Sequence, residues 1–152
     1  MTPEERLVQL GITLPDPPPA VGAYLGAVEH NGFLYVSGHG PYRDGDYVYR
    51  GKVDSVVSVE SAREAAELTM LNALGSARAA LGSLDRVIRV VKLLGMVNSD
   101  PDFAEQPKVI DAASNLLAEI FGDNGRHARS AVGLGALPMT ISVEIEMILA
   151  IR

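Results

Sequence analysis

The chain has 152 residues, of which 47% are hydrophobic and 21% are charged, a balance typical of one water-soluble domain with a single core. No stretch approaches the roughly 18 consecutive apolar residues that a membrane-spanning helix requires. The absence of cysteine excludes disulfides, thiol catalysis and Cys-ligated zinc. The net charge of −6 argues against nucleic acid as a ligand, because Lys and Arg supply most of the affinity for phosphates. The opening residues lack the basic-then-apolar run of a secretory signal, so we expect a cytoplasmic protein with no membrane or nucleic-acid partner.

The first residues predict a short helix followed by a stiff connector. Thr2 is a suitable N-cap, Pro3 suits the first turn, and Gly11 is expected to end the helix. The proline-rich run at 15–19 favours an extended conformation. We therefore divide the chain into residues 1–19, a helix and connector, and residues 20–152, one compact domain.

The domain begins with strand patterns. Residues 23–29 and 33–37 are expected to form a hairpin, because the Asn-Gly pair at 31–32 suits a turn with positive φ at both central positions. A second hairpin is expected around 44–46, with residues 47–52 on its far arm.

Two helices are predicted after these strands. The first covers about 59–81, with Ser58 as its cap and Gly82 at its end, and the second covers about 107–121, ending at Gly122. Each has an apolar stripe at helical spacing. The stripes are Ala62, Ala65, Ala66, Thr69, Met70, Ala73, Leu74 and Ala77 in the first helix, and Val109, Ala112, Ala113, Leu116, Leu117 and Ile120 in the second.

Three further strands are predicted at 87–97, 128–134 and 140–151. The strand at 87–97 is apolar on both faces, which is typical of a strand that is covered on both sides. Simple alternation places Val87, Val91, Leu93 and Val97 on one face and Ile88, Val90, Leu94 and Met96 on the other. In the last strand, odd positions from Ile141 to Ile151 are all apolar, and Glu144, Glu146 and Ile148 lie on the opposite face.

The order of strands, helix, strand, helix and strands indicates an α+β domain with a mixed sheet. Two helices suffice to cover one face of such a sheet. The other face, with Ile148 and Ala150, is then an apolar patch of a kind that soluble monomers rarely expose. We therefore expect this face to be covered by other copies of the chain.

The sequence holds few candidates for chemistry. It lacks the phosphate-binding, serine-hydrolase and zinc-protease motifs. The histidines, His30, His39 and His127, lack metal-ligand spacing, so no metal is expected; His39 lies in a glycine-rich break and is a candidate for ligand contact. Arg129 and Glu144 lie on strands that we expect to be neighbours, where both side chains would reach the same small volume. The simpler alternative is an exposed cross-strand ion pair, worth only about 0.2–1 kcal/mol.

Several segments together resemble the RidA/YjgF family. Residues 126–132, Arg-His-Ala-Arg-Ser-Ala-Val, followed by Leu137-Pro138 and by Val-Glu-Ile-Glu at 143–146, are similar to its C-terminal signature. Residues 21–24, Val-Gly-Ala-Tyr, resemble the family's Gly-Pro-Tyr motif, and residues 33–41 resemble its strand ending in Ser-Gly-Gln/His-x-Pro. The match extends from about residue 20 to 151.

This resemblance implies a chorismate-mutase-like fold and a homotrimer with ligand sites between subunits. It implies that Arg129 grips a substrate carboxylate, that Glu144 places water or shuttles a proton, and that Tyr24 closes the site. Backbone groups near Gly38 and Ala131 would contribute hydrogen bonds. The implied reaction is hydrolysis of reactive enamines and imines to 2-oxo acids and ammonia, without a cofactor.

The sequence departs from the family at three places. Ala23 replaces the usual proline, and Ala131 stands where many members have cysteine. Asp111, Ser114 and Asn115 are the candidates for the position of a family asparagine. A non-catalytic protein that binds or senses a small carboxylate remains an alternative. Endoribonuclease and chorismate mutase activities are further alternatives, disfavoured by the acidic composition and by the lack of several converging cations.

Overall fold

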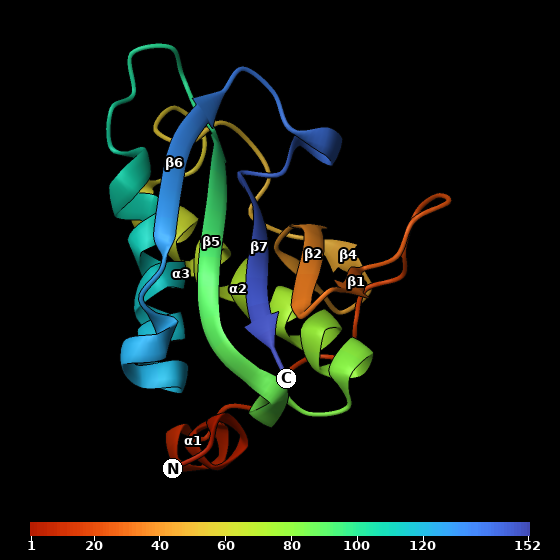
Figure 1. Ribbon diagram of the computed structural model, residues 1–152. Coiled ribbons are helices and arrows are strands. Elements are labelled where there is room, and N and C mark those ends of the chain that lie inside the picture. The colour runs from red at the N-terminus through yellow and green to blue at the C-terminus, as the bar shows by residue number, and fades with distance from the viewer.

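The computed structural model describes all residues from 1 to 152. The helices are α1 (Pro3–Leu10), α2 (Val59–Leu81) and α3 (Gln106–Phe121), and the strands are β1 (Ala27–His30), β2 (Phe33–His39), β3 (Tyr42–Arg43), β4 (Asp46–Tyr47), β5 (Val87–Asn98), β6 (Ala128–Leu134) and β7 (Val143–Ile151). Five strands form one sheet in the order β1-β2-β7-β5-β6, and α2 and α3 lie on the same face of it (Figure 1). No helix has the length and apolar character needed to cross a membrane. The predicted α+β class with a mixed sheet is confirmed.

Local sequence signals set the ends of the helices. In α1, Thr2 and Glu5 form a reciprocal capping box, and Gly11 ends the helix at φ +68°. In α2, the Ser58 hydroxyl accepts a hydrogen bond from the Ser61 amide, and Gly82 ends the helix in the left-handed conformation. All eight predicted stripe positions of α2 are buried. The predicted boundaries of α2 are therefore confirmed.

Helix α3 connects two parallel strands. It leaves the end of β5, crosses the covered face of the sheet and returns as β6, which pairs with β5 in parallel register. Strand β7 pairs with the other side of β5, so β6 is an edge strand and β5 separates it from β7. The expectation that the Arg129 strand and the Glu144 strand are neighbours is therefore wrong, because the chain between them crosses the end of β5 instead of forming a hairpin.

Two irregularities in β5 shift its side chains between faces. The register with β7 breaks between Val87 and Arg89 and again between Val90 and Lys92. As a result Val90 is fully buried with Leu93, whereas Val91 is half-buried. The predicted grouping of Val91 with Leu93 is wrong, because each bulge adds a residue that strict alternation cannot anticipate.

The core lies between the sheet and the helices. Strand β7 contributes its odd positions from Val143 to Ile151, all of which are buried as predicted. The N-terminal segment joins the same core, since Leu7 and Leu14 are buried within it. The expected second hairpin is present but short: β3 and β4 pair over two residues each, and Tyr49 takes a positive φ directly after them.

The second face of the sheet has no cover within the chain. Val28, Phe33 and Tyr35 on β1 and β2 are exposed to 47%, 37% and 46%. A shallow hollow of about 670 Å³ lies on this face, with Lys92 and Glu146 among its lining side chains. We call this surface the open face. An apolar open face is what the sequence predicted.

The turn after α3 offers a test of this packing. A Cβ atom added at Gly125 would lie 2.1 Å from the Leu117 carbonyl oxygen and 2.9 Å from the Ala118 Cα, both backbone atoms that cannot rotate away. We expect Gly125→Ala to lower the free energy of unfolding by about 1–3 kcal/mol, as measured by urea denaturation. Gly135→Ala is the control, since a Cβ there meets nothing within 4 Å. Equal stability of the two variants would contradict the described packing.

Candidate functional site

Arg129 lies on the edge strand β6 with its side chain on the helix-covered side of the sheet. It is in register with Leu93, and its Nη1 donates hydrogen bonds to Asp111 Oδ1 at 2.8 Å and to Ser114 Oγ at 3.2 Å. Asp111 and Ser114 are three residues apart on α3, so both face the same strand. The Arg129 side chain is 23% exposed and that of Asp111 is 50% exposed. The guanidinium is thus held from one side by α3 and reaches the surface at the edge of the sheet.

A chain of hydrogen bonds fixes the orientation of Ser114. His127 Nδ1 lies 2.6 Å from the Gly125 carbonyl oxygen, so this nitrogen carries the proton and donates. The other ring nitrogen, Nε2, then accepts from the Ser114 hydroxyl at 3.0 Å. Burial lowers the pKa of His127, the hydrogen bond to the Gly125 carbonyl partly opposes this, and the charge of Arg129 lowers the pKa slightly further. The neutral ring leaves a lone pair of Ser114 free to accept from Arg129.

Glu144 belongs to a second cluster, on the open face. It lies on β7, and a Cβ added at Gly38 would come within 2.9 Å of the Glu144 carboxylate. The absence of a Cβ at Gly38 gives the carboxylate the space to lie against β2 at this point. Burial raises the pKa of Glu144 above its usual value, and the neighbouring charge of Glu146 raises it further. A carboxyl group with a raised pKa keeps its proton to a higher pH than an ordinary glutamate, which makes it a candidate general acid or base.

Tyrosines complete this second cluster. Tyr24, Gly38 and Tyr47 line one small hollow, and the rings of Tyr42 and Tyr47 pack edge to face with their centroids 5.2 Å apart. Burial raises the pKa of Tyr47, with smaller effects from Tyr24, Tyr42 and Glu144. The segment that carries Tyr24 is tied to β2, since Ser37 donates through its hydroxyl to the Leu25 carbonyl at 2.6 Å and through its amide to the Gly26 carbonyl at 2.9 Å. Tyr24 itself remains 51% exposed. Tyr47 was not predicted as a site residue, and no motif in the sequence pointed to it.

His39 lies at the end of β2 and lines a small hollow with Tyr24 and Gly38, and hydrogen bonds within the chain hold its ring. Its side chain is 6% exposed, and its Nδ1 lies 2.6 Å from the Ser37 carbonyl oxygen. The Nε2 atom lies 2.7 Å from the hydroxyl of Ser76 on α2. Burial lowers the pKa of His39, so it accepts from Ser76 as a neutral ring. Both nitrogens are used within the chain, and His39 supports β2 from the helix side instead of presenting a nitrogen to a ligand.

The predicted site residues therefore form two groups within one chain. Gly38 lies against Glu144 and lines a small hollow with Tyr24. Arg129 and Ala131 lie on β6, two positions apart on its helix-covered side. Arg129 is in register with Leu93 and Met147, and Glu144 is in register with Met96, so the two charged side chains point to opposite faces of the sheet. The expectation that Arg129 and Glu144 of the same chain share one small volume is wrong.

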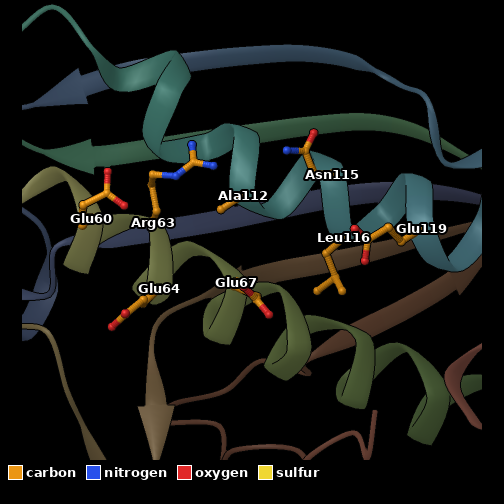
Figure 2. Close-up of a pocket in the computed structure, with 8 residues that line it drawn as sticks. All are labelled: Glu60, Arg63, Glu64, Glu67, Ala112, Asn115, Leu116 and Glu119. Atoms are coloured by element: carbon orange, nitrogen blue, oxygen red, sulfur yellow. The ribbon is translucent and has the colours of Figure 1, made fainter. Parts of the chain in front are cut away.

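Another hollow lies on the outer surface of the helix layer, with a volume of about 370 Å³ (Figure 2). Its lining side chains are Glu60, Arg63, Glu64 and Glu67 from α2 and Ala112, Asn115, Leu116 and Glu119 from α3. Four glutamates against one arginine repel an anionic ligand. Asn115 lines this groove, so it is Asp111 and Ser114, and not Asn115, that contact Arg129.

Comparisons with known proteins agree on one family. A model of the family described as YjgF/chorismate mutase-like candidate endoribonucleases matches residues 4–149. Protein TCP17 from Trypanosoma cruzi is 39% identical over 148 residues, which are 97% of this chain and 92% of TCP17. The crystal structure of Atu1372 from Agrobacterium tumefaciens is 45% identical with a TM-score of 0.91, over 99% of this chain and 92% of that one.

Two further structures share the fold. A candidate endoribonuclease from Shewanella oneidensis is 33% identical with a TM-score of 0.94, over 99% of this chain and 100% of its own. E. coli TdcF, solved with bound serine, is 21% identical with a TM-score of 0.65, over 90% of this chain and 93% of its own. At this level of identity the comparison shows a shared fold only. The chain belongs to the RidA/YjgF family, and the predicted chorismate-mutase-like fold is confirmed.

The raised pKa of Glu144 predicts a pH-dependent change in stability. Because folding disfavours the ionised carboxylate, ionisation of Glu144 weakens the native state as the pH rises above the usual value of 4.5. We expect Glu144→Gln to raise the melting temperature at pH 7 and to lose this advantage below pH 4.5, as measured by calorimetry. Glu119→Gln, on the exposed face of α3, is the control for charge. A variant with equal stability to the parent at every pH would contradict the described environment.

Proposed function

We propose that the protein hydrolyses small reactive enamines or imines of amino acids to 2-oxo acids and ammonia, with Arg129 binding the substrate carboxylate. One observation carries this proposal: α3 holds the Arg129 guanidinium through Nη1 alone. The Nε and Nη2 atoms make no hydrogen bond within the chain. That edge of the guanidinium matches a carboxylate with two parallel hydrogen bonds.

The energetics of this contact suit a small metabolite. Hydrogen bonds to charged groups contribute about 1.5–3 kcal/mol each, so two of them give about 3–6 kcal/mol before the cost of association. Because Arg129 is already oriented by Asp111 and Ser114, little side-chain freedom remains to be lost on binding. Even without that cost, 3–6 kcal/mol corresponds to dissociation constants of about 10 mM to a few tens of micromolar, so the Arg129 contact gives weak affinity of the kind expected for a small metabolite.

We propose further that the active assembly is a homotrimer with sites between subunits. The apolar open face has no cover within one chain. Arg129 and Glu144 face opposite sides of the sheet, so one copy alone does not unite them. A seam between copies, where β6 of one copy meets the open face of another, joins the Arg129 group to a Glu144 group. The resemblance to the RidA/YjgF family, which implies a homotrimer, agrees with this arrangement.

In the proposed reaction, water adds to the carbon of the C=N bond and a proton passes to nitrogen. The resulting carbinolamine then loses ammonia, whose nitrogen takes the C–N bonding pair, and the hydroxyl proton is released as the 2-oxo acid forms. Glu144 accepts a proton from the attacking water and returns it to the departing nitrogen, a role that its raised pKa supports. Tyr24 covers the substrate, and backbone groups at Gly38 and Ala131 hold it. Imines are reactive by nature, so orientation and one acid–base group suffice.

A non-catalytic role in binding or sensing a small carboxylate is the second candidate. It needs the same Arg129 anchor and no proton transfer, and it is favoured by the report of serine bound to TdcF. The raised pKa of Glu144 favours the enzyme, because a binding protein has no use for a proton-holding carboxyl group beside its ligand.

The assembly predicts a solution mass of about 48 kDa, three times the chain mass of 16.1 kDa, by light scattering after gel filtration. Ile148→Asp places a charge on the open face and is expected to reduce the mass to that of one chain. Val8→Asp, at an 81% exposed position of α1, is the control and is expected to keep the larger mass. A parent protein of 16.1 kDa in solution would contradict the proposed seam.

The Arg129 contact predicts the kinetics of ammonia release from freshly generated 2-iminobutyrate. We expect Arg129→Ala to lower kcat/KM by about 100-fold or more, because two charge-assisted hydrogen bonds are lost. Arg129→Lys is expected to recover little, because an ammonium group cannot form the paired contact.

Arg63→Ala removes the same charge from the helix layer and is the matched control, with an expected change of less than about twofold. Ammonia release by the parent at the uncatalysed rate, together with intact binding of 2-oxobutyrate, would overturn the enzyme in favour of the binding protein. Full activity in Arg129→Ala would overturn both roles of Arg129.

A further inference from the structure

Asp111, the residue that pairs with Arg129, affects which ligand the site can bind. Asp111 places a carboxylate 2.8 Å from the guanidinium, within the same exposed edge of the molecule. Half of the Asp111 side chain is exposed, so this carboxylate is accessible from the surface that a ligand would approach. A lone anion at Arg129 therefore meets a site whose charge is already balanced.

The geometry leaves one free oxygen as well as one free guanidinium edge. Asp111 bonds to Arg129 through Oδ1, and Oδ2 makes no hydrogen bond within the chain. Arg129 uses Nη1 for both of its contacts, which leaves Nε and Nη2. A carboxylate acceptor and a paired donor edge, both without partners in the chain, thus belong to two side chains that contact each other, of which Asp111 is half exposed and Arg129 is 23% exposed.

Ser114 and His127 keep these two groups in this arrangement. The Ser114 hydroxyl proton is directed to His127, so its oxygen accepts from Arg129 and offers no proton to a ligand carboxylate. Two side chains contact the Arg129 guanidinium, and only Asp111 of the two is charged. The charged groups of this contact are therefore one cation, Arg129, and one anion, Asp111.

We propose that Asp111 determines specificity, and that the site selects small molecules that carry a carboxylate and, on the adjacent carbon, a cationic nitrogen. The carboxylate binds the Nε and Nη2 edge of Arg129, and the nitrogen donates to Asp111 Oδ2. Protonated 2-imino acids and α-amino acids have this pattern, whereas 2-oxo acids present only the anion. Since a ligand carboxylate beside Asp111 is repelled unless a cation accompanies it, the site favours the nitrogen-bearing substrate over the 2-oxo acid product.

This inference rests on the proposed binding of a carboxylate by Arg129, and it adds the identity of the second group. It also predicts that Asp111 weakens the binding of the product. A product that has lost its cationic nitrogen binds more weakly than the substrate, so its release does not oppose the reaction.

The test compares two probes of nearly equal size, L-alanine and pyruvate, by isothermal titration calorimetry on the intact protein. We expect L-alanine to bind the parent about tenfold more tightly than pyruvate. Asp111→Asn keeps the size and the acceptor oxygen for Arg129 but removes the charge, and we expect it to reduce this preference about tenfold or to reverse it. Glu119→Gln removes one charge elsewhere on α3 and is expected to leave the preference unchanged. A thermal melt of each variant confirms that it is folded.

The outcomes separate this inference from the proposed function. Pyruvate binding as tight as L-alanine binding in the parent, with no change in Asp111→Asn, would overturn the role of Asp111 while leaving Arg129 as a carboxylate anchor. Equal shifts in Asp111→Asn and Glu119→Gln would reduce the effect to net charge and would also overturn it. Binding of neither probe to the parent, or binding that survives Arg129→Ala, would overturn both proposals.

Discussion

The contact between Arg129 and helix α3 is the interaction on which the functional account depends. An arginine on an edge strand is ordinarily a mobile surface group whose ion pairs are worth little. Here Asp111 and Ser114 hold one nitrogen of the guanidinium, and the neutral ring of His127 fixes the serine in turn. The remaining edge keeps its direction without any ligand. Preorganisation of this kind lowers the entropic cost of ligand binding, which is the reason for proposing Arg129 as the binding group.

The architecture explains why this group lies where it does. The path from β5 through α3 to β6 forms a parallel crossover, which places β6 at the edge of the sheet and α3 directly over it. The same path puts α2 and α3 on one face and leaves the other face apolar and open (Figure 1). We propose that the edge with Arg129 and the face with Glu144 are complementary parts of one site between copies, because they point to opposite sides of the sheet within one chain. In the proposed assembly, closure of the open face and completion of the site are the same event.

Much of the fold was predictable because its signals are local. Capping residues such as Thr2 and Ser58 and terminal glycines such as Gly82 mark helix ends within a few residues, and the alternation of β7 is uninterrupted. The faces of β5 were mispredicted at Val91, because bulges depend on the partner strand. The separation of β6 from β7 was missed because a connection of ordinary length does not reveal whether it turns back or crosses a strand.

The candidate site shows the same division. The sequence singled out Arg129 and Glu144 by residue type and resemblance, and it correctly placed Glu144 opposite the apolar row of β7. It did not predict that Arg129 faces the helices, since the face of a short edge strand depends on the register with β5. The choice among Asp111, Ser114 and Asn115 required the rotation of α3 about its axis, which packing against the sheet determines. Such tertiary relations have no counterpart in the spacing of residues.

The most direct measurement of the central claim is a crystal structure of the protein with 2-oxobutyrate bound. The account predicts the ligand carboxylate on the Nε and Nη2 edge of Arg129, with the Glu144 group of a neighbouring copy facing its carbonyl carbon. A carboxylate bound away from Arg129, or an Arg129 edge that faces bulk solvent with no second copy beside it, would contradict the account.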